Sequence, residues 1–481
     1  MVFSSPEFLF LFLPIVLIVY LLLDGRMKNG WLLLASLFFY AWGEGRLVLL
    51  MILSIGINYL GGQAIAKTQQ SQRLWLTKVT LGVAISINLA FLAYYKYVNF
   101  FLDNLQGIGA FKGVRMEAII LPIGISFFTF QSISYLIDVY RKETEAQQNP
   151  FHLGLYIALF PQLIAGPIVR YHDIANQIEN RHHSAKKFSE GALRFARGLA
   201  KKMVIANPMA MLADQAFNAP ADELSTLSAW VGIVCYSLQI YFDFSGYSDM
   251  AIGLGKMFGF RFLENFQWPY ISRSIQEFWR RWHISLSSWF RDYLYIPLGG
   301  NRKGAGRTYI NLFIVFLATG LWHGANWTFV IWGLYHGLFI ILERLGFRNT
   351  LNRMPRPISH LYLLLVVMVG WVFFRADSLS HATTYLGSMI GMGSGKYIDV
   401  LYYLDGYHIF ILALGLIFST NLRRTVIYLL LKQQRKLKGL SSKSFSFCYQ
   451  VYRIGWMTFL MVWAITELAQ NSYNPFIYFR F

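Results

Sequence analysis

Long apolar runs recur along almost the whole chain. They extend from Phe8 to Thr466 and are separated only by short polar loops. About 20 apolar residues in an α-helix are enough to cross the hydrocarbon core of a bilayer. Helices also satisfy their own backbone hydrogen bonds, which lipid cannot do. We therefore expect an all-α, polytopic integral membrane protein.

The runs give about a dozen candidate spanning helices, several of them short. They lie near residues 8–23, 31–43, 46–61, 78–98, 117–138, 200–217, 227–247, 308–324, 327–343, 358–374, 408–422 and 453–469. We expect a bundle of about 11–13 transmembrane helices with added re-entrant and interfacial helices. Residues 1–481 are expected to form a single membrane domain. Its expected parts are peripheral N-terminal helices over 1–110, a catalytic core over about 117–345 and C-terminal helices over 358–481.

The basic residues lie mainly in the loops between these runs. The 481 residues are 56% hydrophobic and carry a formal net charge of +19. Loops such as 170–202, 256–307 and 344–356 are rich in Lys and Arg, which places them in the cytoplasm and both termini outside. The charge is thereby explained by topology, so we expect contact with membrane lipid and no nucleic-acid binding. Two cysteines, Cys235 and Cys448, give no disulfide framework, and no paired spacing predicts a metal site.

Two apolar segments do not fit a simple alternation of cytoplasmic and outer loops along the chain. Residues 151–169 are apolar, yet the loops on both sides are basic. Pro161 and Pro167 interrupt a regular helix there, and broken backbone at membrane depth must be buried in protein or line a wet cavity. We predict a re-entrant element beside a cavity on the cytoplasmic side. Residues 423–439 are apolar in the middle and basic at both ends, which predicts a helix in the membrane interface.

The stretch GLWHGANW sets a histidine inside an apolar run. In a helix over 308–327, one face carries Leu312, Phe316, Thr319, His323 and Asn326. Gly320 and Gly324 lie beside the histidine. His323 lies roughly 24 Å along that helix from the cytoplasmic end. An apolar setting favours the neutral ring, which can accept a proton. An intramembrane histidine indicates function by default, and the alternative is a structural histidine bonded across helices.

A second buried polar group is predicted in YSLQIYFDFSGYSDM. One helical face there carries Tyr236, Gln239, Asp243, Gly246 and Tyr247, so Asp243 faces the interior. Such a carboxylate must find a donor. It either orients a histidine or joins helices structurally, and the residues leave both readings open.

The segment from Glu277 to Arg307 combines aromatic and basic residues. Tryptophans alternate with arginines, including Trp279 and Arg280, which is typical of an interfacial helix with aromatics at headgroup depth. His283 lies within it. The following GGNRKGAGR contains Arg302, Lys303 and Arg307, which have the charge to hold the phosphates of a nucleotide-like donor. An ordinary positive-inside loop explains the same composition.

Six stretches carry a resemblance to the membrane-bound O-acyltransferase family, and they are spread over nearly the whole chain. They are LPIGISFFTFQSISYLIDVYR, LFPQLIAGPIVRYHDI, LQIYFDFSGYSDMAIGLGKMFGF, WRRWHISLSSWFRDYLYIPLGGNR, GLWHGANWTFVIWGLYHG and YNPFIYFRF. The family's two motif histidines match His283 and His323, and the second corresponds to the catalytic position. Within the family the stretches are most similar to those of alginate O-acetylation proteins.

The resemblance implies an O-acetyltransferase of the bacterial inner membrane. It implies that acetyl groups come from a cytoplasmic donor, acetyl-CoA, and reach the outer side. Periplasmic acetyltransferase or acetyl-acceptor proteins and the exopolysaccharide machinery are the implied partners, with alginate as one such polymer. No metal is expected.

The residues themselves allow a matching mechanism. His323 takes the proton of an attacking hydroxyl or carries the acyl group transiently, and the sequence leaves both open. Asp243 or Asn326 is expected to fix the ring's tautomer. Trp279, Arg280 or His283 is expected to stabilise developing charge. His336, in IWGLYHG, is expected to be structural or pore-lining. The alternative functions are a transporter or flippase, whose buried Asp and His would couple ions, and a non-catalytic membrane scaffold for secreted acetyltransferases.

Overall fold

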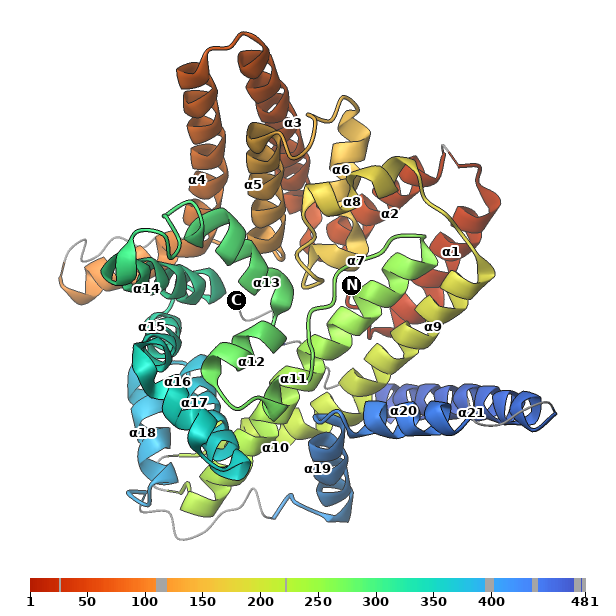
Figure 1. The fold of residues 1–481 in the computed structure, drawn as a ribbon, viewed down its shortest axis with the longest axis vertical. Helices are drawn as coiled ribbons and strands as arrows, with labels where there is room; N and C mark the ends of the chain where they lie inside the picture. The colour runs from red at the N-terminus through yellow and green to blue at the C-terminus, as the bar shows by residue number, and fades with distance from the viewer. Residues whose placement is uncertain are drawn as a thin grey trace. The chain divides into compact units, whose positions relative to one another are not determined.

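The computed structural model describes residues 1–25, 27–109, 119–220, 223–393, 402–434, 440–470 and 477. Throughout these ranges every regular element is a helix (Figure 1). The all-α prediction is therefore confirmed. The chain divides into two compact units, Met1–Ala192 with Ala251–Leu263, and Leu193–Met250 with Glu264–Arg480. The division into three parts expected from the sequence stays a prediction.

The first unit begins with apolar helices that match the expected runs. Its helices are α1 (Leu13–Leu22, continuing a π-helical segment Glu7–Phe12), α2 (Met27–Glu44), α3 (Val48–Gln70), α4 (Leu74–Gly107), α5 (Ile125–Arg141), α6 (Pro150–Ala158), α7 (Phe160–Leu163) and α8 (Tyr171–Glu179). A short 3-10 turn, Gly45–Leu47, separates α2 from α3, and Gly45 there has a φ of 55°. Two further helices, α9 (Ala185–Ala200) and α11 (Thr226–Met257), contribute residues to both units.

The run at 151–169 is broken where the sequence predicts. Helix α6 ends at Ala158, α7 begins at Phe160 with Pro161 in its first turn, and no helix continues beyond Leu163 until Tyr171. Almost every side chain from Leu153 to Val169 is buried. Non-helical backbone in an apolar segment is thus covered by protein, as the energetics of buried peptide groups require. The depth of this segment in the membrane and the cavity beside it stay predictions.

The second unit contains the remaining helices. They are α10 (Asn207–Asn218, preceded by a π-helical segment Lys201–Ala206), α12 (Ile275–Arg281), α13 (Ile284–Phe290, followed by a π-helical segment Arg291–Tyr295), α14 (Gly304–His323), α15 (Trp327–Leu342, followed by a π-helical segment Glu343–Phe347), α16 (Arg348–Arg353), α17 (Arg356–Arg375), α18 (Leu379–Met389), α19 (Gly406–Phe418), α20 (Leu422–Gln434) and α21 (Leu440–Gln470). A 3-10 turn, Pro269–Ile271, precedes α12. Of the expected interfacial run 423–439, residues 423–434 are in α20 and 435–439 lie outside the described residues.

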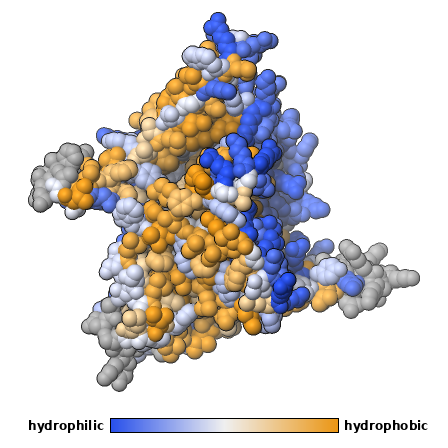
Figure 2. Space-filling view, turned by 60° about the vertical axis from the view of Figure 1, so that its left-hand side comes forward, coloured by the Kyte–Doolittle hydropathy of each residue, from blue (hydrophilic) through white to orange (hydrophobic). Residues whose placement is uncertain are grey.

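Among the described residues, six helical stretches are long and apolar enough to cross a membrane. They are Met27–Gln70, Leu74–Gly107, Thr226–Met257, Gly304–His323, Trp327–Arg353 and Arg356–Arg375, and two shorter apolar helices are Glu7–Leu22 and Gly406–Phe418. Hydrophobic residues cover much of the surface seen in Figure 2. The protein is therefore a multi-pass membrane protein, because such a surface is stable only against lipid. The expected total of about 11–13 spans stays a prediction.

Candidate active site

The hairpin of α14 and α15 carries His323 at its turn. The two helices lie side by side (Figure 1), and glycines allow their backbones to approach closely. A Cβ on Gly320 would collide with the carbonyl oxygen of Phe329, and one on Gly333 would collide with the carbonyl oxygen of Phe316. Small residues at a helix crossing are the usual device for close packing in membranes. The space beside Gly320 is therefore occupied by the backbone of α15.

His323 lies in an aromatic enclosure at the end of α14. The residue is 3% exposed, so it is buried as predicted. Its ring centroid lies 4.9 Å from that of Trp322, 4.8 Å from Trp332 and 5.2 Å from Phe374, in edge-to-face arrangements. Leu312, Phe316 and Thr319 are buried on the same face of α14, as expected. The imidazole is thus packed between aromatic rings on three neighbouring residues.

The expected continuation of this helix to residue 327 is wrong. Helix α14 ends at His323, and Gly324 and Asn326 have extended backbone. Asn326 caps α15 instead: its side-chain oxygen accepts from the Thr328 amide at 3.0 Å, and its amide donates to the Asp377 carbonyl at 3.0 Å. Asparagine is a preferred helix-capping residue, and this local bond competes with continuing the helix. Asn326 therefore does not share the face of His323.

His283 is buried between two short helices. The expected single interfacial helix is wrong, because α12 ends at Arg281 and α13 begins at Ile284. His283 itself adopts a left-handed conformation with φ of 44° and is 0% exposed. The tryptophans of this segment, Trp279, Trp282 and Trp289, are also buried in protein, and their position at headgroup depth stays a prediction. Burial of the aromatic side chains in protein outweighs the amphipathic pattern from which an interfacial helix was expected.

Hydrogen bonds fix the tautomer of His283. The Oδ1 atom of Asn265 accepts from the backbone amide of Ser285 at 3.1 Å and from its hydroxyl at 2.9 Å. The same oxygen lies 3.2 Å from Nδ1 of His283, so Nδ1 carries the proton and donates. Burial lowers the pKa of His283 to about 3, so its ring is neutral. Its Nε2 is left as the basic nitrogen.

Trp322 joins the two motif histidines into one aromatic cluster. Its ring centroid lies 6.1 Å from that of His283 and 4.9 Å from that of His323. Phe244 also packs against His283, with ring centroids 4.6 Å apart. Two histidines separated by 40 positions in the sequence thus both contact a single indole.

His336 extends this cluster along α15. It is 0% exposed, and its ring centroid lies 5.2 Å from that of Trp332 and 5.3 Å from that of Trp279. Among the described residues, neither ring nitrogen of His336 has a hydrogen-bond partner, and neither do the indole nitrogens of Trp279 and Trp332. The contacts of these three side chains among the described residues are therefore aromatic packing contacts.

Asp243 has a lysine as its partner. All five residues of its predicted face are buried. A carboxylate oxygen of Asp243 lies 2.8 Å from Nζ of Lys202, and the other accepts from the backbone amide of Ile477 at 2.9 Å. The carboxylate therefore joins α11 to the Lys201–Ala206 segment and to Ile477. This geometry corresponds to the structural reading of Asp243 and does not make it the residue that orients His323.

The cationic residues lie outside this cluster. Arg280 is exposed, although its neighbour Trp279 is buried. Arg302, Lys303 and Arg307 are exposed around the start of α14, where Gly299, Gly300 and Gly304 have positive φ and turn the chain. An exposed basic turn of this kind has the chemistry to bind phosphate, and it is equally what positive-inside topology produces.

The sequence analysis missed the aromatic walls of the site. Trp322, Trp332 and Phe374 surround His323 but were not singled out. A signal was present in the helix after the histidine, since Trp332 and His336 are four residues apart and Gly333 and Gly337 follow the same spacing. That pattern predicts one face of α15 with small and aromatic residues packed against α14.

The described residues thus form a multi-pass helical membrane protein with two buried histidines at one aromatic cluster. The family model for the membrane-bound O-acyltransferase family matches residues 148–381. The probable alginate O-acetylase AlgI of Pseudomonas putida is 43% identical over the full length of both chains. The corresponding protein of Pseudomonas aeruginosa is 49% identical over 82% of this chain and 76% of its own.

A third relative has a different named acceptor. The peptidoglycan O-acetyltransferase of Helicobacter pylori is 40% identical over 82% of this chain and 80% of its own. The chain belongs to the membrane-bound O-acyltransferase family, and the protein is an acyltransferase.

Proposed function

We propose that this protein is an inner-membrane O-acetyltransferase that takes acetyl groups from cytoplasmic acetyl-CoA and passes them outward for O-acetylation of an exopolysaccharide such as alginate. The full-length similarity to alginate O-acetylases supports the polymer class. The observation that carries the proposal is the position of His323, buried at one aromatic cluster with His283. A water-poor enclosure protects a thioester from hydrolysis.

His323 acts as the general base in the proposed reaction. It takes the proton of the acceptor hydroxyl as the oxygen attacks the thioester carbonyl carbon. The carbon–sulfur bond then breaks, and the thiolate leaves and recovers a proton from the imidazolium. In the variant that the sequence leaves open, His323 itself becomes acetylated and then transfers the group to the hydroxyl. Both routes need the same neutral imidazole.

The other site residues have supporting roles. His283 and Trp279 are proposed to hold the donor and its developing charge, since both lie in the aromatic cluster. Arg302, Lys303 and Arg307 are proposed to attract the phosphates of the donor from the cytoplasm. Periplasmic acetyltransferase or acetyl-acceptor proteins of the exopolysaccharide machinery receive the acetyl group.

Radiolabelled acetyl transfer by the purified full-length protein tests this assignment. The donor is acetyl-CoA, and the soluble partner proteins are present or omitted. We expect His323→Ala to lower transfer by at least about 1000-fold, because it removes both the base and the alternative nucleophile. His381→Ala is the matched control, since His381 is half-buried on α18 and outside the cluster. Transfer that survives in His323→Ala at normal protein level would remove the catalytic assignment of His323, and absence of transfer by the wild-type protein would favour a scaffold or transporter.

A further inference from the structure

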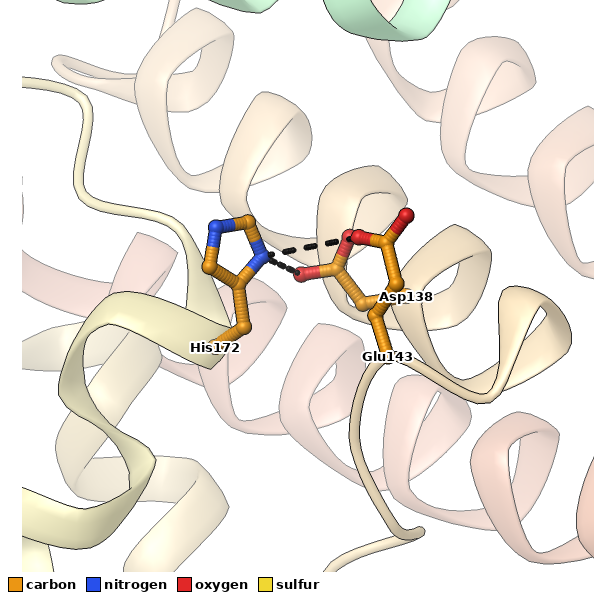
Figure 3. A group of neighbouring side chains, drawn as sticks. All are labelled: Asp138, Glu143 and His172. Carbon is orange, nitrogen blue, oxygen red and sulfur yellow. Dashed lines mark hydrogen bonds and ion pairs between the residues drawn. The ribbon is translucent and has the colours of Figure 1, made fainter.

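A second polar cluster lies in the first unit and has no part in the proposed acetyl transfer. Figure 3 shows Asp138, Glu143 and His172 turned toward one another. Nδ1 of His172 lies 2.8 Å from Oδ2 of Asp138 and 3.8 Å from Oε2 of Glu143. One ligand atom from each of the three residues lies within 4.8 Å of the other two. The cluster joins the end of α5, the loop after it and the first turn of α8.

We propose that Asp138, Glu143 and His172 bind a divalent transition-metal ion such as Zn²⁺ or Mn²⁺. Ligand atoms about 2.0–2.2 Å from an ion are separated from one another by roughly 3–4.4 Å. Nδ1 of His172 lies 2.8 Å and 3.8 Å from the two carboxylates, which is close to this range, so small side-chain rotations suffice. One imidazole and two carboxylates form a donor set that suits these ions better than Ca²⁺ or Mg²⁺, which prefer oxygen alone.

The backbone places Glu143 over Asp138. Helix α5 ends with Lys142 in the left-handed conformation, at φ of 61°. The amide of Glu143 then donates to the carbonyl of Asp138 at 2.9 Å, and the amide of Lys142 donates to that of Val139 at 3.1 Å. This pair of bonds is the Schellman motif, which reverses the chain at a helix end. The fixed turn holds both carboxylates on the same side of α5.

A further carboxylate orients the imidazole. Oδ1 of Asp173 lies 3.4 Å from Nε2 of His172, on the ring edge opposite the cluster. Histidines that bind metals through one nitrogen usually donate the other N–H to a carboxylate or carbonyl. A carboxylate at this position favours a proton on Nε2 when Nδ1 binds an ion.

The charge of the cluster favours a cation. Three carboxylates lie around one imidazole: Nδ1 of His172 is 2.8 Å from Asp138 and 3.8 Å from Glu143, and Nε2 is 3.4 Å from Asp173. Their negative charge attracts a metal ion, which displaces the proton on Nδ1 to solvent. Arg141 lies 3.8 Å from Glu143 and competes for that carboxylate only weakly, since Glu143 is 46% exposed.

Water reaches the cluster from one side. The side chain of Asp138 is fully buried, whereas those of His172 and Glu143 are 29% and 46% exposed. An ion can therefore enter from solvent and keep water as its remaining ligands. It would tie α5 to α8 and so close the segment between them, which includes the broken run at 151–169. Closing a segment of this length stabilises the fold through the entropy of the unfolded chain.

Metal titration of the full-length protein in detergent tests the site. After chelation and dialysis, Zn²⁺ or Mn²⁺ is added, and bound metal and Tm are measured. We expect about one equivalent of bound ion and a higher Tm. Glu143→Gln should lose the bound ion and the Tm increase, while its metal-free Tm stays that of wild type because the Asp138–His172 pair remains. Asp173→Asn should weaken binding by about tenfold or more.

Two control variants separate this site from surface binding. Glu145→Gln and His182→Gln remove an exposed carboxylate and an exposed imidazole from neighbouring positions and should leave metal binding unchanged. Absence of bound metal in wild type, or equal binding by wild type and Glu143→Gln, would overturn the proposal and leave an Asp138–His172 ion pair only. Acetyl transfer is not the readout, so the result is independent of the proposed function.

Discussion

His283 combines two energetically unfavourable features, a left-handed backbone and a fully buried polar ring. Its backbone is left-handed, which costs a non-glycine residue roughly 1–2 kcal/mol, and its ring is fully buried. The contacts with Asn265, Phe244 and Trp322 offset these costs. Strained, buried polar residues cluster at functional sites, where the surrounding structure holds them in place. The residue therefore sets the shape of the cluster that includes His323.

The stability of the protein is predicted to fall in acid because of His283. Burial lowers its pKa from 6.5 to about 3, so below pH 6.5 the unfolded chain binds a proton that the folded chain excludes. The contribution of the neutral ring is complete above pH 6.5 and is lost as the pH falls toward 3, by up to about 1.4 kcal/mol per pH unit. Thermal unfolding in detergent at about pH 7.5 and pH 5 measures this effect. His283→Asn keeps a residue that tolerates left-handed backbone and should show a smaller drop in Tm between the two pH values. An equal drop in both proteins would contradict the assignment.

At the scale of elements, the α14–α15 hairpin depends on glycine. Gly320 and Gly333 lie at the crossing, and each would place a Cβ against the backbone of the other helix. This contact brings Trp332 beside His323. The position of the base thus depends on two residues that have no side chain.

Gly320→Ala is predicted to separate the two helices. The new methyl group would meet the Phe329 carbonyl oxygen, so the backbone must move, at a cost of about 1–3 kcal/mol. We expect a lower Tm and a loss of acetyl transfer, because His323 shifts relative to Trp332. Gly306→Ala, in the first turns of the same helix, meets nothing within 4 Å and should leave both quantities nearly unchanged. Similar behaviour of the two variants would show that the crossing tolerates a side chain.

At the scale of the whole molecule, the membrane orients the chain. The basic turn around Arg302 is expected in the cytoplasm, and the first turn of α18, which contains Ser380, is expected outside. Both positions are exposed. The three spans expected between them, 308–324, 327–343 and 358–374, place them in different compartments.

Cysteine labelling tests this orientation. In a background without Cys235 and Cys448, Ser380→Cys should react with a membrane-impermeant maleimide in intact spheroplasts. Arg302→Cys should react only after the membrane is permeabilised or inverted. The opposite pattern would reverse the assigned orientation. If both positions were labelled from the same side, the number of membrane spans between them would be even, which contradicts the three expected spans.

The helical class, the multi-pass character and the burial of His323 can all be predicted from the amino-acid sequence. These follow from local composition, because apolar runs cannot remain in water and helices satisfy their backbone in lipid. The broken run at 151–169 was predictable for the same reason, since proline interrupts hydrogen bonding locally.

Only the tertiary structure decided which polar groups meet. Asp243 pairs with Lys202, Asn326 caps α15, and His283 shares Trp322 with His323, although the sequence allowed other partners. Asp138 and His172 likewise come together from different helices. Burial is set by the periodicity of one segment, whereas a pairing depends on how two distant segments pack, and helical spacing carries no information on that packing.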